Sequence, residues 1–350
     1  MNCCRSDQTV PARSQGGAAL LIALFVLAVA MVVVTGLSKS AIIAARRAEN
    51  QLLADQAWYY LIGVEELAIE LLKFKRRERD AATDAATDAA TDDALPAMAP
   101  LELSGRYATD HGWIAFDVVD LQGRFNINSL RPTGPPTVQP DVPNNLEQRR
   151  FVRLLRSLDG LEVELDQAIA LTEALVDWLD GDQLETGFSG AELPYYSDKS
   201  PPYRTADGAM RDVSELLLVS GMTPELFQAL EPLVTVWPLD GGTINVASAG
   251  TAVLRSLYEE DPLNLTPLPL ERAETLQEAM ANGEIHGLAE FLRRPEWGLT
   301  PLPPSNLVDS GDLFVISSQT RVGRIDQALD SVVQITDNKA KVLARSLRML

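Results

Sequence analysis

Carboxylates crowd one short stretch in the middle of the chain. Residues 177–185 read DWLDGDQLE, and residues 190–192 read GAE. Negative side chains this close repel one another unless a cation or water screens them. Because Ca²⁺ takes about 6 to 8 oxygen ligands from flexible loops, four side chains are candidate ligands together with main-chain carbonyls: Asp180, Asp182, Glu185 and Glu192. The alternative is a solvated acidic loop, and the EF-hand spacing is not met.

The sequence offers little for catalysis. Its only histidines are His111 and His286, and its cysteines, Cys3 and Cys4, lie at the extreme amino terminus. No Gly-x-Ser-x-Gly or zinc-binding motif occurs, so the sets of catalytic residues that hydrolases commonly use are missing. We therefore predict no enzymatic activity and no catalytic residue. A membrane-anchored hydrolase that uses the acidic cluster is kept as an alternative function.

Nucleic acid is an unsuitable partner for this chain. The 350 residues carry a formal net charge of -19, which repels phosphate backbones. Residues 242–249 resemble the helix-hairpin-helix segments of DNA-binding modules, but the flanking charges are mostly acidic. We assign Asn245 a structural role at the mouth of a helix, with Ser248 as a candidate N-cap. A helix-hairpin-helix DNA-uptake receptor is the second alternative.

The first element of the chain is predicted to be an apolar helix. Ala18–Leu37 is twenty residues without a charged side chain, and at about 1.5 Å per residue it can span a bilayer core of about 30 Å. Basic residues stand on both sides of it, so charge does not fix the orientation. No proline occurs between Pro11 and Pro96, which predicts one long helix to about Asp80.

Beyond the apolar segment the same helix is amphipathic. Apolar residues recur at steps of three and four and predict a stripe that a domain covers: Leu53, Ala57, Tyr60, Val64, Leu67 and Leu71. The opposite face is predicted to carry Arg46, Arg47, Glu49, Asp55, Glu65 and Glu66. Residues 81–92 are three copies of Ala-Ala-Thr-Asp, which we interpret as a flexible loop.

Two β-rich pairs flank a block of helices. Trp113–Val119 and Phe125–Asn128, around Gln122-Gly123, predict a β-hairpin, and Asp312–Ile316 with Asp330–Ile335 predict a second pair in the same head. The block between them is predicted to contain helices over Leu146–Leu158, Asp166–Leu179, Val213–Val219, Pro224–Val234, Thr251–Tyr258 and Leu270–Met280. The basic C-terminal tail is expected to form an amphipathic helix.

The amino-terminal junction resembles the class III signal of type IV pilins and pseudopilins. In that signal a prepilin peptidase cuts after a glycine at the polar/apolar boundary, which places the cut between Gly17 and Ala18. Ile22 takes the fifth position, where glutamate is usual, and this departure resembles the K subunit of type II secretion systems and suits a filament tip. For this segment alone, an ordinary uncleaved single-pass anchor is the alternative.

The resemblance implies an α+β fold: a pilin-like long N-terminal helix with a small antiparallel sheet interrupted by a large helical insertion. It implies a prepilin leader over 1–17, a transmembrane and extended helix over 18–80 and a low-complexity loop over 81–100. The first β part of the head then covers 101–131, the helical insertion 132–305, and the last β part with the tail 306–350.

Function and ligands also follow from the resemblance. It implies a non-enzymatic minor pseudopilin of the inner membrane with a periplasmic head. Its expected partners are the I and J minor pseudopilins, the major pseudopilin and the prepilin peptidase, without nucleic acid. Similar K subunits bind calcium around a segment that this chain matches at Asp177, Trp178, Asp180, Asp182, Gly190, Ala191, Glu192, Tyr195 and Tyr196. One or two structural Ca²⁺ ions are therefore expected.

Overall fold

The computed structural model describes residues 16–89, 98–101, 103–132, 145–259, 265–299, 301–336 and 339–349. The predicted leader, 1–17, therefore lies outside the described residues up to position 15. Before the insertion the chain forms α1 (Gly16–Ala89), β1 (Leu103–Thr109), β2 (Gly112–Asp120), η2 (Leu121–Gly123), β3 (Phe125–Asn126) and η3 (Ile127–Leu130).

Short helices dominate the insertion. They are α2 (Leu146–Leu155), α3 (Leu165–Leu179), α4 (Leu193–Ser197), η4 (Val213–Leu218), α5 (Pro224–Leu230), η5 (Glu231–Leu233), α6 (Thr251–Ser256), α7 (Leu270–Ala281), α8 (Leu288–Leu292) and η6 (Pro295–Trp297). Three two-residue strands accompany them: β4 (Val234–Thr235), β5 (Ile244–Asn245) and β6 (Leu307–Val308). The chain ends in β7 (Leu313–Val322), β8 (Ile325–Thr336) and β9 (Lys339–Met349).

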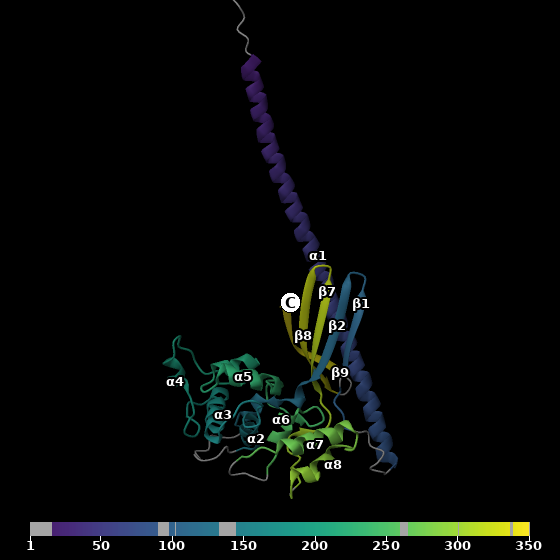
Figure 1. Ribbon diagram of the computed structural model, residues 1–350, viewed down its shortest axis with the longest axis vertical. Coiled ribbons are helices and arrows are strands. Elements are labelled where there is room, and N and C mark those ends of the chain that lie inside the picture. The colour runs from purple at the N-terminus through teal and green to yellow at the C-terminus, as the bar shows by residue number, and fades with distance from the viewer. Residues whose placement is uncertain are drawn as a thin grey trace, which may run out of the picture.

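Helix α1 is exposed at its start, and its later part packs against the sheet. Figure 1 shows its first part extending away from the rest of the molecule and its later part running beside the sheet. Ala57, Leu61 and Val64 are buried there, and with Leu72 they face the sheet. The predicted apolar stripe is thus confirmed, except that Leu67 is exposed.

The head is one antiparallel sheet in the order β1-β2-β7-β8-β9. Strand β2, from before the insertion, pairs with β7, from after it, with Val118 opposite Ile316. Strand β2 and the carboxyl-terminal strands therefore share one head, as predicted, whereas Phe125–Asn128 lies outside this sheet. Alternate residues of β2, β7 and β8 form the apolar core against α1, including Phe116, Phe314 and Val333.

The insertion lies at the end of the sheet away from the exposed part of α1 (Figure 1). Its separate, larger apolar core includes Phe151 and Trp178 and also Phe125, so the part of the predicted head segment 101–131 that follows β2 packs with the insertion. Its helices begin where the sequence supplies caps: Thr223 Oγ1 accepts the Leu226 N–H at 3.2 Å, and Pro224 takes the first helical turn. The predicted helices over α2, α3, α5, α6 and α7 are confirmed, with shorter ends in α2, α5 and α6.

Hydrogen bonds of polar side chains connect the insertion to the head. The buried Asp120 carboxylate accepts hydrogen bonds from Asn245 Nδ2 at 2.6 Å and from Ser248 Oγ at 3.0 Å. Gln122 Oε1 accepts the Asp312 N–H at 2.6 Å, at the return into β7. Asn245 therefore has the predicted structural role. Ser248 is not the N-cap of α6, since Gly250 takes that position.

Two predictions about strands were wrong. Strand β2 forms its hairpin with β1, not with Phe125–Asn128, because Phe125–Asn126 pairs in parallel with β4 inside the insertion. The tail is strand β9 rather than a helix, and it pairs antiparallel with β8. In both cases pairing with a distant segment overrides the local pattern.

Two predictions about α1 were also wrong. The helix continues to Ala89, beyond the predicted end at Asp80, because alanine is the strongest helix former; residues 90–97 are not described. Glu65 was assigned to the solvent face but is buried. It faces β8 and β9, where Arg345 Nη2 and Nε donate to its carboxylate at 2.7 Å and 2.9 Å and Ser331 Oγ is also bonded to it.

Candidate functional site

The acidic site forms where α3 ends and α4 begins. Asp180 is the C-cap of α3 and has an extended backbone that turns the chain out of the helix. Glu192 is the extended N-cap residue of α4, directly before Leu193-Pro194. The intervening loop returns on itself, so that ligand oxygens of Asp180, Asp182 and Glu192 lie within 4.8 Å of one another.

Three of the four predicted side chains therefore converge. Asp180 and Asp182 are half-buried and Glu192 is buried. Glu185 is exposed in the loop and lies outside this group. The local sequence gave no sign of this division, because it depends on how the loop folds back onto α3.

Within the part of the chain that the structure describes, several buried oxygens in the site have no hydrogen-bond partner. Both carboxylate oxygens of Glu192 are unpartnered, as are Asp180 Oδ1 and Asp177 Oδ2, although Glu192 is only 1% exposed. A buried, unpaired charge is costly unless a cation or a proton neutralises it. The oxygens are hard ligands of the type that Ca²⁺ prefers, so the residues present fit that ion.

The pKa values of carboxyl groups in the site are raised, which reflects the lack of positive charge around them. Burial, followed by the neighbouring charges of Asp182 and Asp177, raises the pKa of Asp180 to about 7. Burial, followed by the charges of Asp177 and Asp180, raises the pKa of Glu192 to about 8. Asp207 also acts on both groups, and the sequence interpretation missed it because it lies on a separate loop.

Asp177 has a different function in the site. Its Oδ1 accepts the Thr186 N–H at 2.9 Å, which fixes the far side of the loop. Burial nevertheless raises the pKa of Asp177 more than its hydrogen bonds lower it, and Oδ2 has no partner among the described residues. Asp177 therefore holds the loop through its main chain, whereas the oxygens of Asp180, Asp182 and Glu192 lie close to one another.

Aromatic side chains hold the two helix ends together. The rings of Trp178 and Tyr196 meet edge to face with centroids 5.3 Å apart, and Tyr196 lies 5.2 Å from Tyr203. Tyr196 is fully buried, and its hydroxyl accepts the Ser220 N–H at 3.2 Å. This packing fixes α4, and hence Glu192, relative to the end of α3.

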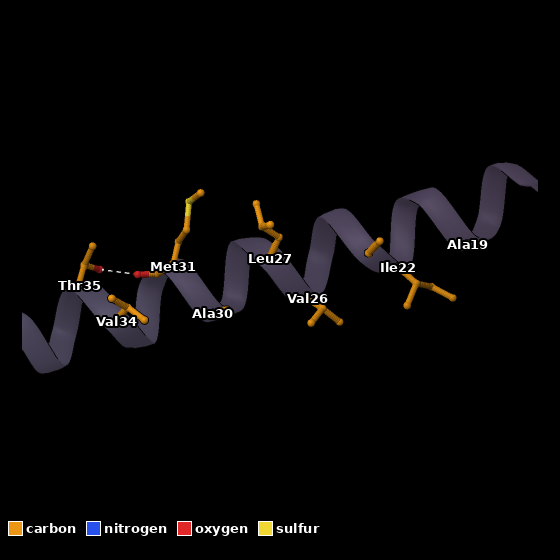
Figure 2. Close-up of a pocket in the computed structure, with 9 residues that line it drawn as sticks. Ala19, Ile22, Val26, Leu27, Ala30, Met31, Val34 and Thr35 are labelled. Carbon is orange, nitrogen blue, oxygen red and sulfur yellow. Dashed lines mark hydrogen bonds between the residues drawn. The ribbon is translucent and has the colours of Figure 1, made fainter.

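The second functional region is the exposed start of α1. The helix is long and apolar enough to cross a membrane, with a mean hydropathy of 3.0 over its most apolar window. Figure 2 shows Ile22, Val26 and Leu27 projecting from the helix, and each is exposed. Thr35 Oγ1 donates to the Met31 carbonyl at 2.9 Å, so its hydroxyl is satisfied within the helix, as a lipid environment requires.

The residues of the predicted processing site lie at the beginning of this helix. Gly17 and Ala18 are within the first turn of α1. Ile22 follows one turn later and is 65% exposed.

Comparison with known proteins finds relatives along most of the chain. A family profile described as "Type II secretion system (T2SS), protein K" matches residues 123–239. The type II secretion system protein K of Pseudomonas aeruginosa is 32% identical over 337 residues, covering 96% of this chain and 93% of the relative. The protein of the same name from Aeromonas hydrophila is 32% identical over 70% of this chain and 72% of its own length.

A solved structure has the same fold. The structure described as the GspK-GspI-GspJ complex from the enterotoxigenic Escherichia coli type 2 secretion system contains a chain that matches with a TM-score of 0.62. The match covers 87% of this chain and 100% of the other at 21% identity. The predicted α+β fold class is therefore confirmed.

The exposed apolar helix, the antiparallel sheet packed on its later part and the large helical insertion define a membrane-anchored, pilin-like protein. Within that class, the similarity along nearly the whole length shows that the chain belongs to the type II secretion system protein K family. The predicted resemblance to this family is confirmed.

Proposed function

We propose that this chain is a minor pseudopilin in the tip complex that initiates or caps the periplasmic pseudopilus, and that its role is structural rather than enzymatic. The observation that carries this proposal is the broad insertion at the end of the head away from the exposed part of α1 (Figure 1). Such a lobe leaves no room for another subunit above it. The complex of GspK with GspI and GspJ supports the I and J pseudopilins as partners, with the major pseudopilin below them.

Position 22 supports the same place in the filament. In major subunits the glutamate at this position is thought to meet the amino terminus of a neighbour. Ile22 offers no carboxylate for that pairing, so a chain with this residue suits the end of an assembly.

Processing and location form a testable part of the proposal. A prepilin peptidase would cut between Gly17 and Ala18, which leaves the apolar helix in the inner membrane and the head in the periplasm. Amino-terminal sequencing of membrane-extracted chain, with and without the peptidase, should give Ala18 as the first residue only when the enzyme is present. An intact Met1 under both conditions would refute the processing site.

The face of α1 opposite the sheet is the best candidate for contact with the partners. The predicted apolar stripe packs on the chain's own sheet, so it cannot serve that purpose over the head. On the other side, Leu52, Tyr59 and Phe74 are exposed, and Tyr59 is 73% exposed. Exposed large apolar side chains on one face of a helix suit a groove or helix of a partner.

This contact can be tested by co-purification. In membranes that contain the I and J pseudopilins, Tyr59→Arg should strongly reduce their recovery with this chain. The control is Gln319→Arg, which places the same charge on an exposed position of strand β7. Equal recovery with both variants would exclude this face of α1 as the contact.

We further propose that Asp180, Asp182 and Glu192 bind one structural Ca²⁺. The support is the buried Glu192 with two unpartnered oxygens that face two other carboxylates. A bound Ca²⁺ would supply the positive charge that the site lacks. We propose one ion rather than two because the described part of the chain contains a single such group, and Glu185 lies outside it.

A further inference from the structure

Helix α3 presents a second carboxylate, one turn before Asp177, to the same loop. Glu173 Oε2 accepts the Ser189 N–H at 2.8 Å, and the Phe188 N–H also donates to this carboxylate. Asp177 in turn accepts from the main chain of Thr186 and Ala191. Two successive turns of α3 therefore hold the loop by its main-chain N–H groups.

The loop has glycine where these carboxylates approach it. Gly187 has a φ of +63°, and a Cβ atom there would lie 1.9 Å from Glu173 Oε1. At Gly190 a Cβ atom would lie 2.3 Å from Asp177 Oδ2. Any side chain at either position would displace the loop from α3, so the close contact depends on both glycines.

The held segment leads directly into the proposed cation site. Glu192 follows Gly190 by two residues, and the main chain of the intervening Ala191 is bonded to Asp177. Glu173 itself lies outside the group formed by Asp180, Asp182 and Glu192. An effect of Glu173 on cation binding must therefore come from the position of the loop or from the Glu173 charge, not from direct coordination.

We propose that Glu173 is a positioning residue for this site. By holding residues 187–189 it keeps Glu192 opposite Asp180 and Asp182, and it thereby sets the affinity for Ca²⁺. The inference rests on the proposed cation site. Its physical basis is preorganisation, since a loop already ordered by α3 loses little conformational freedom when the cation binds. Groups that orient metal ligands contribute to affinity in this way without touching the metal.

The test is calorimetric titration of CaCl₂ into the full chain in detergent. Glu173→Gln keeps the size of the side chain but replaces one acceptor oxygen with an amide donor. Its dissociation constant should rise about tenfold or more, as is typical when a group that orients metal ligands is altered. The stoichiometry should stay the same, because the three ligands are intact.

A charge-matched control separates positioning from simple loss of charge. Asp166→Asn removes one negative charge from an exposed position two turns earlier on α3 and should leave the dissociation constant within about twofold of wild type. Gly187→Ala disturbs the same contact from the loop side and should weaken binding as Glu173→Gln does. A merely structural role would lower the melting temperature in chelator without changing the affinity for Ca²⁺.

The outcomes distinguish the two proposals. Wild-type binding with unchanged affinity in both Glu173→Gln and Gly187→Ala would overturn the positioning role and leave the cation site standing. No binding to wild type at millimolar CaCl₂ would overturn the cation site and this inference together. Weaker binding in the two variants, with the Asp166→Asn control unaffected, would support both.

Discussion

Two glutamates in this chain are equally buried and have opposite surroundings. Glu65 on α1 and Glu192 before α4 are each 1% exposed. Glu65 accepts two hydrogen bonds from Arg345 and is also bonded to Ser331. Among the described residues, neither carboxylate oxygen of Glu192 has a hydrogen-bond partner. The head thus supplies its own cation to a buried carboxylate, whereas the described part of the insertion supplies none to Glu192.

Their acidities diverge for this reason. Burial tends to raise the pKa of Glu65, but the bonds from Arg345 and Ser331 outweigh it, and the pKa lies below its ordinary value. Burial and like charges raise the pKa of Glu192 to about 8. The comparison teaches that burial alone does not decide the charge of a carboxylate. The nearest partner does, and the described residues offer none to either Glu192 oxygen.

The largest expected effect is that of the cation itself. Ca²⁺ at about a hundred times its dissociation constant should stabilise the full chain by about 2.7 kcal/mol over chelator, because it binds only the folded site. Thermal unfolding followed by circular dichroism measures this as a higher midpoint for the insertion. Mg²⁺ at the same concentration is the control, since it prefers to keep its water ligands. An unchanged midpoint at millimolar Ca²⁺ would show that Glu192 does not gain its missing partner from bound Ca²⁺.

The next effect concerns the internally satisfied carboxylate. Glu65→Gln should destabilise the head by about 2 kcal/mol, because a charge-assisted pair is replaced by a weaker neutral contact. The figure is below that for a fully buried pair, since the Arg345 side chain is 43% exposed.

Calcium should make no difference to this loss, which denaturant unfolding with and without chelator would show. Glu66→Gln, at the exposed neighbouring position, is the matched control and should have little effect. A loss for Glu65→Gln that disappears in Ca²⁺ would mean that the two regions are not independent.

The sequence was sufficient where the determining contacts are local. The unbroken helix, the paired strands β7 and β8 and the convergence of Asp180 with Asp182 all follow from neighbouring residues. Strand β9 was misread because its lysine, arginine, leucine and alanine residues favour a helix when no partner strand is considered.

Most of the remaining errors come from contacts between distant segments, whereas the end of α1 was missed for a local reason, the helix propensity of alanine. Arg345 lies 280 residues from Glu65 along the chain, so the burial of Glu65 on the sheet side could not be seen. The contact made by Glu173 also escaped prediction, because it joins a helix to the main chain of a loop and leaves no pattern of residue types. Asp207 reaches the acidic site for the same long-range reason.

A smaller effect should change sign with calcium. In chelator the buried Glu192 carboxyl must either take up a proton or remain an unpaired charge, so near neutral pH Glu192→Gln should be more stable than wild type by about 1 kcal/mol. In saturating Ca²⁺ the order should reverse, because the variant has lost a ligand. Melting temperatures of both proteins in the two conditions measure the crossover. A variant that is less stable than wild type in both would show that Glu192 is already satisfied without a cation.

The smallest effect is the acid response of Glu65. Its pKa is lowered by folding, so the unfolded chain binds more protons as the pH falls, and stability decreases with falling pH. The contribution of Glu65 is complete above its unfolded pKa of about 4.3 and is lost as the pH drops through the lower folded value. The stability difference between wild type and Glu65→Gln should therefore shrink from about pH 5 toward about pH 3, because a protonated glutamate resembles glutamine. Denaturant unfolding across this range in constant Ca²⁺ measures it. A constant difference would show that the Arg345 pair does not hold the charge on Glu65.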